Sequence, residues 1–185
     1  MGPVPVRARR PRRPPRHKRT CDVLPVLPRT HADVAFIGKP LPVKTRTLQV
    51  CLERAAHYYR LPVLLLDAIV WQEGGTDGVG DRDPDGSYDL GIAQINTRWL
   101  SVFSKYGITA RSLLDNPCEN LYAAAYVLDT YVQRFGGQNW FRATMAYNIG
   151  PNGWSNPVRY RLGYRYARSV MWKWHVLYER TRQDK

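Results

Sequence analysis

The chain has no long apolar run, few cysteines and few histidines, and each scarcity excludes a class of protein. No stretch approaches the roughly 18 apolar residues of a membrane-spanning helix, so we expect no transmembrane segment. No histidine lies at metal-ligand spacing from any of the three cysteines, so we expect no zinc site, and we expect no cofactor. The apolar share of 44 % is that of an ordinary globular protein, which excludes a fibrous or wholly disordered chain.

Acidic residues are scarce at both ends of the chain. Its 185 residues include 28 Lys and Arg against 15 Asp and Glu, a net charge of +13, yet residues 47–158 carry a net charge of −3. Residues 1–46 hold 12 basic and 2 acidic residues and nine of the 14 prolines. Because proline removes helix and sheet hydrogen bonds and like charges repel, we expect residues 1–46 to form a disordered Arg/Pro-rich arm.

Two interpretations of this arm remain open. A solvated tail is the commoner fate of a charged run, and a segment that binds polyanions is the alternative. The near-neutral body argues against a nucleic-acid-binding protein. The apolar stretch of the arm, residues 23–28, is interrupted by two prolines, so we do not predict a secretory signal peptide.

Residues 47–185 are predicted to form one domain that is mainly α. Apolar periodicity and capping residues predict helices over residues 47–60, 62–73, 96–105, 117–135, 139–147 and 157–180. The last helix is predicted to place one set of residues on a single face: Tyr160, Tyr164, Ala167, Met171, Trp174 and Tyr178. Alternating strand patterns are lacking except for one short β-hairpin expected near residues 79–90.

Glu73 is the carboxylate whose surroundings best suit catalysis. It ends an apolar helix and precedes Gly74 and Gly75, which let a ligand approach the backbone closely. Partial desolvation in such a place raises a carboxyl pKa, as a general acid near neutral pH requires. The alternative is a Glu at a helix end that points into water.

A second acidic feature is the loop over residues 81–86, which resembles the opening of a calcium-binding loop. Its twelfth position should be a bidentate Glu and is Ile92, so half of the pattern is missing. We therefore expect no metal here and interpret the loop as a turn held by Asp side chains, with Asp89 tying it to the next segment.

Two of the three cysteines, Cys51 and Cys118, fall in predicted helices, whereas Cys21 lies on the arm. Cys51 and Cys118 are either two small buried apolar residues or a disulfide between helices, which would indicate an oxidising compartment. Two cysteines by themselves do not decide between these alternatives.

Three motifs follow one another along the body. They are Glu73-Gly74, the Gly-Ile-Ala-Gln-Ile-Asn stretch of residues 91–96, and the Ala-Tyr-Asn-Ile-Gly stretch of residues 146–150. In this order they resemble the signature of the family 1 lytic transglycosylases, whose soluble lytic transglycosylase domain is related to goose-type lysozyme. The resemblance covers about residues 48–175 and implies a compact, lysozyme-like helical fold. Gly74 departs from the family's usual Ser, and Ile92-Ala93 depart from Leu-Met.

This resemblance implies a reaction and roles for four residues. The substrate would be peptidoglycan, cut between N-acetylmuramic acid and N-acetylglucosamine. Glu73 would first protonate the leaving oxygen and then, as a base, draw the proton from the muramic acid 6-hydroxyl to close a 1,6-anhydro ring. Gln94, Tyr147 and Asn148 would position the substrate. From the residues alone, Tyr147 would be a core residue and Asn148 a helix C-cap.

The chain also resembles the specialised branch of this family that serves type IV secretion, conjugation or pilus systems. That branch has a Cys in its first helix and an Asn-Pro-Cys-x-Asn stretch, here residues 116–120. The resemblance implies a Cys51–Cys118 disulfide, a periplasmic location, and partners in such an apparatus.

Two alternatives to a transglycosylase remain. One is a goose-lysozyme-like hydrolase, with Asp83, Asp85 or Asp89 activating water. The other is a catalytically inactive wall-binding component, which the departure at Gly74 makes conceivable.

Overall fold

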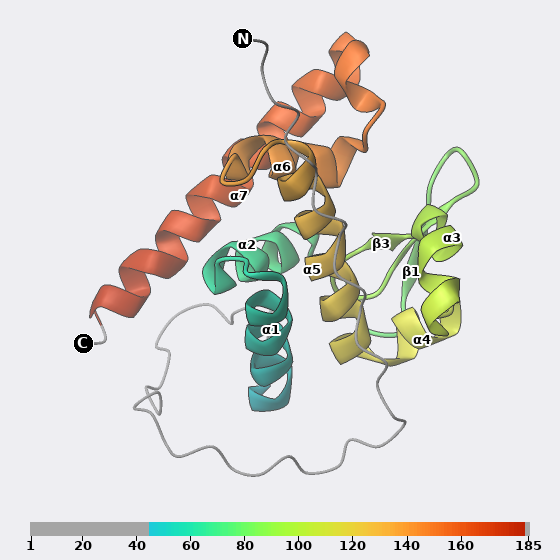
Figure 1. Cartoon of the computed structure of the whole chain (residues 1–185), viewed down its shortest axis with the longest axis horizontal. Coiled ribbons are helices and arrows are strands. Elements are labelled where there is room, and N and C mark those ends of the chain that lie inside the picture. The colour runs from blue at the N-terminus through green and yellow to red at the C-terminus, as the bar shows by residue number, and fades with distance from the viewer. Residues whose placement is uncertain (1–44, 184–185) are drawn as a thin grey trace, which may run out of the picture.

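Helices and one small sheet make up the described part of the chain, residues 45–183, in a computed structural model (Figure 1). The main helices are α1 (Arg46–Tyr59), α2 (Val63–Glu73), α5 (Pro117–Arg134), α6 (Trp140–Ile149) and α7 (Pro157–Gln183). The strands are β1 (Gly80–Arg82), β2 (Tyr88–Leu90) and β3 (Ile95–Asn96). Short helices complete the fold: η1 (Thr97–Trp99), α3 (Leu100–Phe103), η2 (Ser104–Tyr106), α4 (Ala110–Asp115) and η3 (Gly153–Ser155).

This architecture confirms the predicted mainly α, lysozyme-like fold class. The predicted arm lies outside the described residues except for its last two, as does Cys21. Thr45 is the N-cap of α1, so the first helix begins one residue earlier than predicted. None of the described helices is long and apolar enough to cross a bilayer.

Local capping chemistry sets the helix ends. The Thr45 hydroxyl accepts a hydrogen bond from the Leu48 N–H, and the Asn116 side chain caps α5, whose first residue is Pro117. These side chains satisfy backbone N–H groups that the first helical turn leaves without partners. At the other end of α2, Gly74 adopts a left-handed φ of 61°, which glycine reaches without steric cost.

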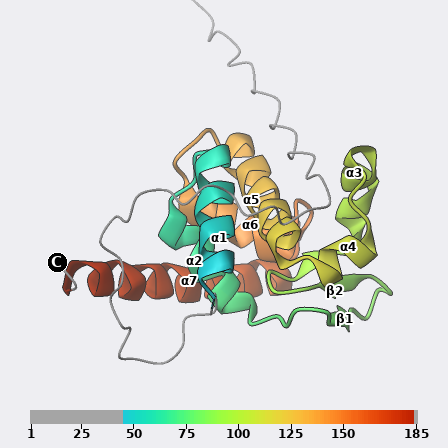
Figure 2. The ribbon, with the colours of Figure 1, turned by 90° about the horizontal axis from the view of Figure 1, so that it is seen from below.

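The apolar core lies around α2. Leu65, Leu66 and Ile69 are fully buried, and Leu121 and Leu128 of α5 are buried in the same cluster. Helix α1 packs against α5, while α7 packs against α2 and α6. Seen from below, α7 lies across one side of the other main helices (Figure 2). These five helices form what we call the helical body.

A second region, the sheet lobe (residues 76–96), is held by polar side chains. Its strands pair antiparallel in the order β1-β2-β3. The Asn96 side-chain amide donates to the carboxylates of Asp83 and Asp89 at 2.9 Å each, and Ser87 donates to Asp83 and Asp85. The predicted turn held by Asp side chains is therefore confirmed, and Asp89 joins it to the next segment.

The segment after the sheet differs from its prediction. Residues 96–105 do not form one helix, because η1, α3 and η2 divide that stretch into short turns that end at Gly107. Strand β3 and helix α4 were not predicted. Helix α4 has a capping box whose second partner is Ser112 in place of the usual Glu, and six residues are too few for a periodic signal.

The predicted face of α7 was wrong for its tyrosines and right for the rest: Ala167 is buried, and Met171 and Trp174 pack against the core. Tyr160, Tyr164 and Tyr178 are exposed. The buried stripe shares Ala167 with the predicted face and otherwise lies beside it: Gly163, Tyr166, Ala167, Val170 and Leu177. Aromatic residues occur on several sides of α7, so periodicity alone could not select the stripe that packs on α2 and α6.

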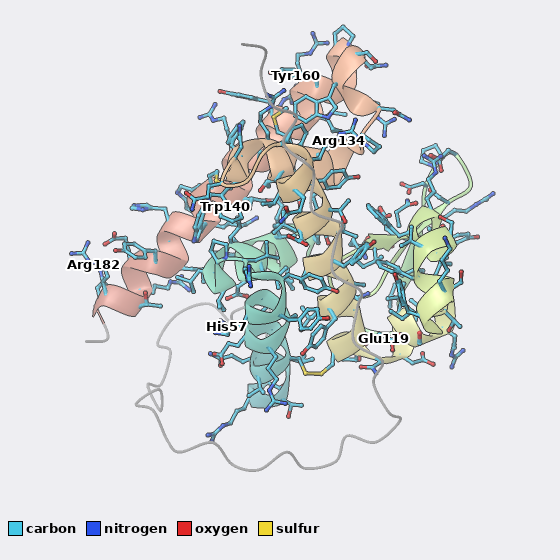
Figure 3. The ribbon with its side chains drawn as sticks, in the orientation of Figure 1. His57, Glu119, Arg134, Trp140, Tyr160 and Arg182 are labelled. Carbon is cyan, nitrogen blue, oxygen red and sulfur yellow. A yellow bond between two sulfur atoms is a disulfide. The ribbon has the colours of Figure 1, made fainter. Side chains whose placement is uncertain are left out.

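Cys51 of α1 and Cys118 of α5 form a disulfide, with Cα atoms 5.4 Å apart and 67 residues between them in sequence. Figure 3 shows this bond as the yellow link between the two helices. It joins two helices that already pack together, at the end of the helical body where α5 begins.

Candidate active site

Glu73 lies at the end of α2, where the helical body meets the sheet lobe. The residue is partly buried, and burial raises the pKa of its carboxyl from 4.5 to about 7. A hydrogen bond from Tyr166 lowers the pKa, the nearby Asp89 carboxylate raises it, and Lys173 lowers it. Desolvation exceeds the other effects, so Glu73 is partly protonated near neutral pH.

The hydroxyl of Tyr166, in α7, donates a hydrogen bond to Oε1 of Glu73 at 2.5 Å. Tyr147 was expected to position the substrate, and Tyr166 was not singled out from the sequence. The two bonded residues are 93 positions apart, so no local pattern joins them. The only signal in the sequence is the spacing of Tyr166 with Gly163 and Val170 along the buried stripe of α7.

The turn over residues 91–94 brings Gln94 beside the end of α2. Gln94 has a left-handed φ of 49°, and its side-chain amide donates to the Gly91 carbonyl at 3.0 Å. A Cβ on Gly75 would overlap the carbonyl oxygen of Gly91 and lie 2.8 Å from Nε2 of Gln94. Glycine at position 75 therefore lets the chain after Glu73 pass directly against this turn.

Tyr147, in α6, holds the same turn from another side. Its hydroxyl donates to the carbonyl of Ala93 at 2.9 Å. Burial raises the pKa of the Tyr147 hydroxyl well above its usual value, and the nearby Glu73 raises it further. Tyr147 therefore lies near Glu73, but its hydrogen bond goes to the backbone before Gln94.

Asn148 occupies a different position from the other predicted site residues. It is exposed, and its side chain forms no hydrogen bond to any residue in the described part of the chain. It is not a helix C-cap, because α6 continues to Ile149 and is capped by Gly150. The structure thus brings Glu73, Gln94 and Tyr147 together and leaves the Asn148 side chain facing solvent.

Asn120 forms a buried polar link from α5 to the same turn. Its side chain is fully buried, donates to the carbonyls of Leu90 and Leu113, and accepts from the N–H of Ala93. Asn120 ends the Asn-Pro-Cys-x-Asn stretch, but nothing else in the sequence marks it as part of the site. Asn120 and Tyr147 therefore hold the backbone of Ala93 through its N–H and its carbonyl.

A positively charged side chain, that of Lys173, lies close to the Glu73 carboxyl. Lys173 of α7 donates to the side-chain oxygen of Gln72 at 2.6 Å, and its Nζ lies 5.5 Å from the centre of the Trp71 ring. Its charge favours the ionised form of Glu73. Among residues 45–183, no group of three His, Cys, Asp or Glu side chains could hold a metal ion.

The site therefore has one partly buried carboxyl with a raised pKa, a tyrosine that donates to it, and the turn over residues 91–94 beside it. Such an arrangement can deliver a proton to a bound ligand and take one back. The family described as Transglycosylase SLT domain matches residues 50–167.

The chain belongs to the transglycosylase SLT family.

Relatives of this SLT domain include proteins of Salmonella, Escherichia coli and Shigella. Invasion protein IagB of Salmonella typhi is 31 % identical over 136 residues, which cover 73 % of this chain and 81 % of that protein. X polypeptide of Escherichia coli is 30 % identical over 116 residues, covering 62 % and 67 %. Protein IpgF of Shigella flexneri is 29 % identical over 121 residues, covering 65 % and 76 %.

Most of the candidate site residues lie within the part of the chain that matches the family. Glu73, Gln94, Tyr147 and Tyr166 all fall inside residues 50–167, whereas Lys173 falls beyond them. Gly74 differs from the Ser that the family signature usually has, and its left-handed conformation explains why glycine suits this position here.

Proposed function

We propose that this SLT domain is a peptidoglycan lytic transglycosylase. It cleaves the bond between N-acetylmuramic acid and N-acetylglucosamine and leaves a 1,6-anhydromuramic end. The observation that carries the proposal is Glu73, whose pKa burial raises to about 7, so that one group can act as acid and then as base near neutral pH.

In the first step, Glu73 donates its proton to the glycosidic oxygen, and the C1–O bond breaks with its electron pair on that oxygen. The N-acetyl group of the muramic acid supports the cationic centre. In the second step, the carboxylate takes the proton of the 6-hydroxyl while that oxygen bonds to C1, so Glu73 ends as it began. The Tyr166 hydrogen bond stabilises the carboxylate between the two steps.

Gln94, Tyr147 and Asn148 position the substrate in this proposal. The exposed amide of Asn148 is available to acetamido groups of the glycan, and amides suit them because each offers both a donor and an acceptor. Gln94 and Tyr147 act from the turn beside Glu73: Gln94 is braced by Gly91, and Tyr147 fixes the backbone carbonyl of Ala93.

The hydrolase alternative needs a second carboxylate that activates water. Asp83 and Asp89 accept hydrogen bonds from Asn96, and Asp85 accepts from Ser87 and Arg98. These bonds favour a structural role for all three carboxylates. Asp89 is the one whose charge reaches Glu73, so it is the residue on which the hydrolase alternative depends.

Mass spectrometry of muropeptides released from purified sacculi tests the choice. We expect fragments that end in 1,6-anhydromuramic acid, which weigh one water less than hydrolysis products. Fragments with reducing ends would instead identify a hydrolase. An intact protein that binds sacculi and releases nothing would be the inactive wall-binding component.

We further propose a periplasmic location and a role in opening the wall locally for a secretion, conjugation or pilus apparatus. The Cys51–Cys118 disulfide supports an oxidising compartment, and the name of one relative, Invasion protein, is compatible with this role. Cell fractionation with thiol labelling tests the location. We expect Cys51 and Cys118 to be unreactive in the native protein, and two reactive thiols at these positions would contradict it.

A further inference from the structure

The outer face of α7 carries an open hollow that the proposed reaction does not use. Its volume is about 360 Å³, and Arg165, Arg168, Ser169 and Trp172 line it. These positions follow the spacing i, i+3, i+4, i+7, so one face of the helix presents all four side chains. Trp172 is 60 % exposed, which is unusual for so large an apolar side chain.

The hollow carries positive charge that no acidic side chain neutralises within residues 45–183. Within residues 45–183, the side chains of Arg165 and Arg168 form neither an ion pair nor a hydrogen bond, and the arginines found in ion pairs there are Arg98, Arg111 and Arg182. Helix α7 as a whole has seven Lys and Arg and a single acidic residue. Two adjacent, unpaired guanidinium groups suit a carboxylate, since their N–H groups can bind both oxygens.

The hollow adjoins the catalytic end of α2. The Trp172 ring lies 6.2 Å from the ring of Trp71, measured between centroids, and Trp71 stands two residues before Glu73. The next residue, Lys173, bonds to Gln72. Arg165 directly precedes Tyr166, whose hydroxyl bonds to Glu73, and Arg168 follows Tyr166 by two residues. This adjacency gives a group that branches from a glycan bound at Glu73 a short path to the two arginines.

We propose that the Arg165–Arg168 hollow binds a carboxylate of the peptide stem that peptidoglycan carries on its muramic acid. This inference rests on the proposed function, because it assumes that the glycan occupies the site of Glu73. The arginines would bind the carboxylate, the Ser169 hydroxyl would donate one further hydrogen bond, and the Trp172 ring would cover apolar atoms of the stem. The hollow would make this SLT domain prefer strands that still carry their peptides.

The test measures strand binding without cleavage, in the full chain with the substitution Glu73→Gln. Two fluorescent, soluble glycan preparations are compared. One keeps its stems, and the other has lost them to an amidase and retains only the lactyl carboxylate close to the sugar. A third preparation, with stem carboxylates converted to amides, separates charge from bulk.

We expect strands with stems to bind about tenfold more tightly than stripped or amidated strands, as one well-placed charged contact allows. Arg165→Gln with Arg168→Gln should remove this preference and leave binding of stripped strands unchanged. The control pair Arg159→Gln with Arg161→Gln removes the same charge from exposed positions of the same helix. It should leave the preference intact.

Three outcomes would overturn the inference: the arginine pair weakens all strands equally, it changes nothing, or the parent chain shows no preference for stems. Equal weakening would indicate general attraction of an anionic polymer. If the arginine pair changes the binding of no strand, the hollow would instead bind something other than the glycan, such as an acidic protein segment. Because binding is measured in a Glu73→Gln chain, failure of the proposed cleavage would be seen separately, as sacculi that the parent chain leaves undigested.

Discussion

The helical body and the sheet lobe are stabilised in different ways. The body buries apolar side chains around α2, and residues such as Leu65 and Leu66 have no exposed surface. Strand β1 of the lobe is wholly exposed, and the lobe depends on hydrogen bonds from Asn96 and from Asn120 of α5. Glu73 lies where the two regions meet. The body desolvates its carboxyl, and the lobe supplies the turn on which a substrate would rest.

The largest expected effect is the loss of activity in Glu73→Gln. Gln can still accept the Tyr166 hydrogen bond but cannot donate a proton at neutral pH. We expect digestion of sacculi to fall by about 10²- to 10⁴-fold, the range that general acid–base catalysis supplies. The melting temperature should not fall. Digestion at the parental rate would contradict the proposed mechanism.

The second effect concerns the helical body alone. The Cys51–Cys118 disulfide closes a loop between residues 67 positions apart and so limits the conformational entropy of the unfolded chain. Its reduction should therefore lower the free energy of unfolding by about 4 kcal/mol. Denaturant titrations with and without reductant measure this loss. The double variant Cys51→Ser/Cys118→Ser is the control and should show no response to reductant. Equal stability of the parent in both conditions would disprove the bridge.

The third effect concerns the link between the two regions. Asn120→Ala leaves two buried carbonyls and the N–H of Ala93 without their partner, so the free energy of unfolding should fall by about 3 kcal/mol. Amide hydrogen exchange should also quicken at residues 91–95. The control Asn139→Ala removes an exposed N-cap from α6 and should cost about 1 kcal/mol without that local change. Unchanged exchange in Asn120→Ala would refute the link.

The fourth effect is a dependence of stability on pH. Glu73 releases its proton near pH 4.5 when unfolded and near pH 7 when folded, so the folded state binds the proton more tightly. This stabilisation is complete below pH 4.5 and is lost as pH rises through 7, by about 3 kcal/mol. Burial likewise raises the pKa of Asp67 to about 6. The folded state therefore also loses stability as pH rises through about 6.

Chemical denaturation between pH 4 and 8 measures this profile. Glu73→Gln should flatten its upper part, whereas Asp67→Asn should flatten only the part below about pH 6. A profile that Glu73→Gln leaves unchanged would show that the carboxyl is not desolvated in the folded state.

The smallest effect is a shift in the pH–rate profile of Tyr166→Phe. The Tyr166 hydroxyl stabilises the charged form of Glu73, so its removal should raise the pKa of Glu73. The alkaline limb of kcat/KM should move up by at most about one pH unit. Tyr164→Phe, at an exposed tyrosine of the same helix, should leave the limb in place. A shift to lower pH would contradict this assignment.

Sequence reasoning succeeded where the signal was local. Asn116-Pro117 began α5 and Gly74 ended α2 as predicted, because caps act on backbone groups within about four residues. It failed where a helix was short, as in α4, or where aromatic residues surrounded a helix, as in α7. The sequence likewise did not predict that Asn148 is exposed or that Tyr147 bonds to the carbonyl of Ala93.

The order of amino acids alone determined the mainly helical character of residues 46–183, the ends of the main helices and the three motifs that mark the family. Only the tertiary structure decided that Tyr166 reaches Glu73, that Asn120 holds the turn before Gln94, and that two arginines share a hollow with Trp172. The reason is physical. Hydrogen bonds within a helical turn depend on neighbours in sequence, whereas desolvation and contacts across 93 residues depend on which faces pack together.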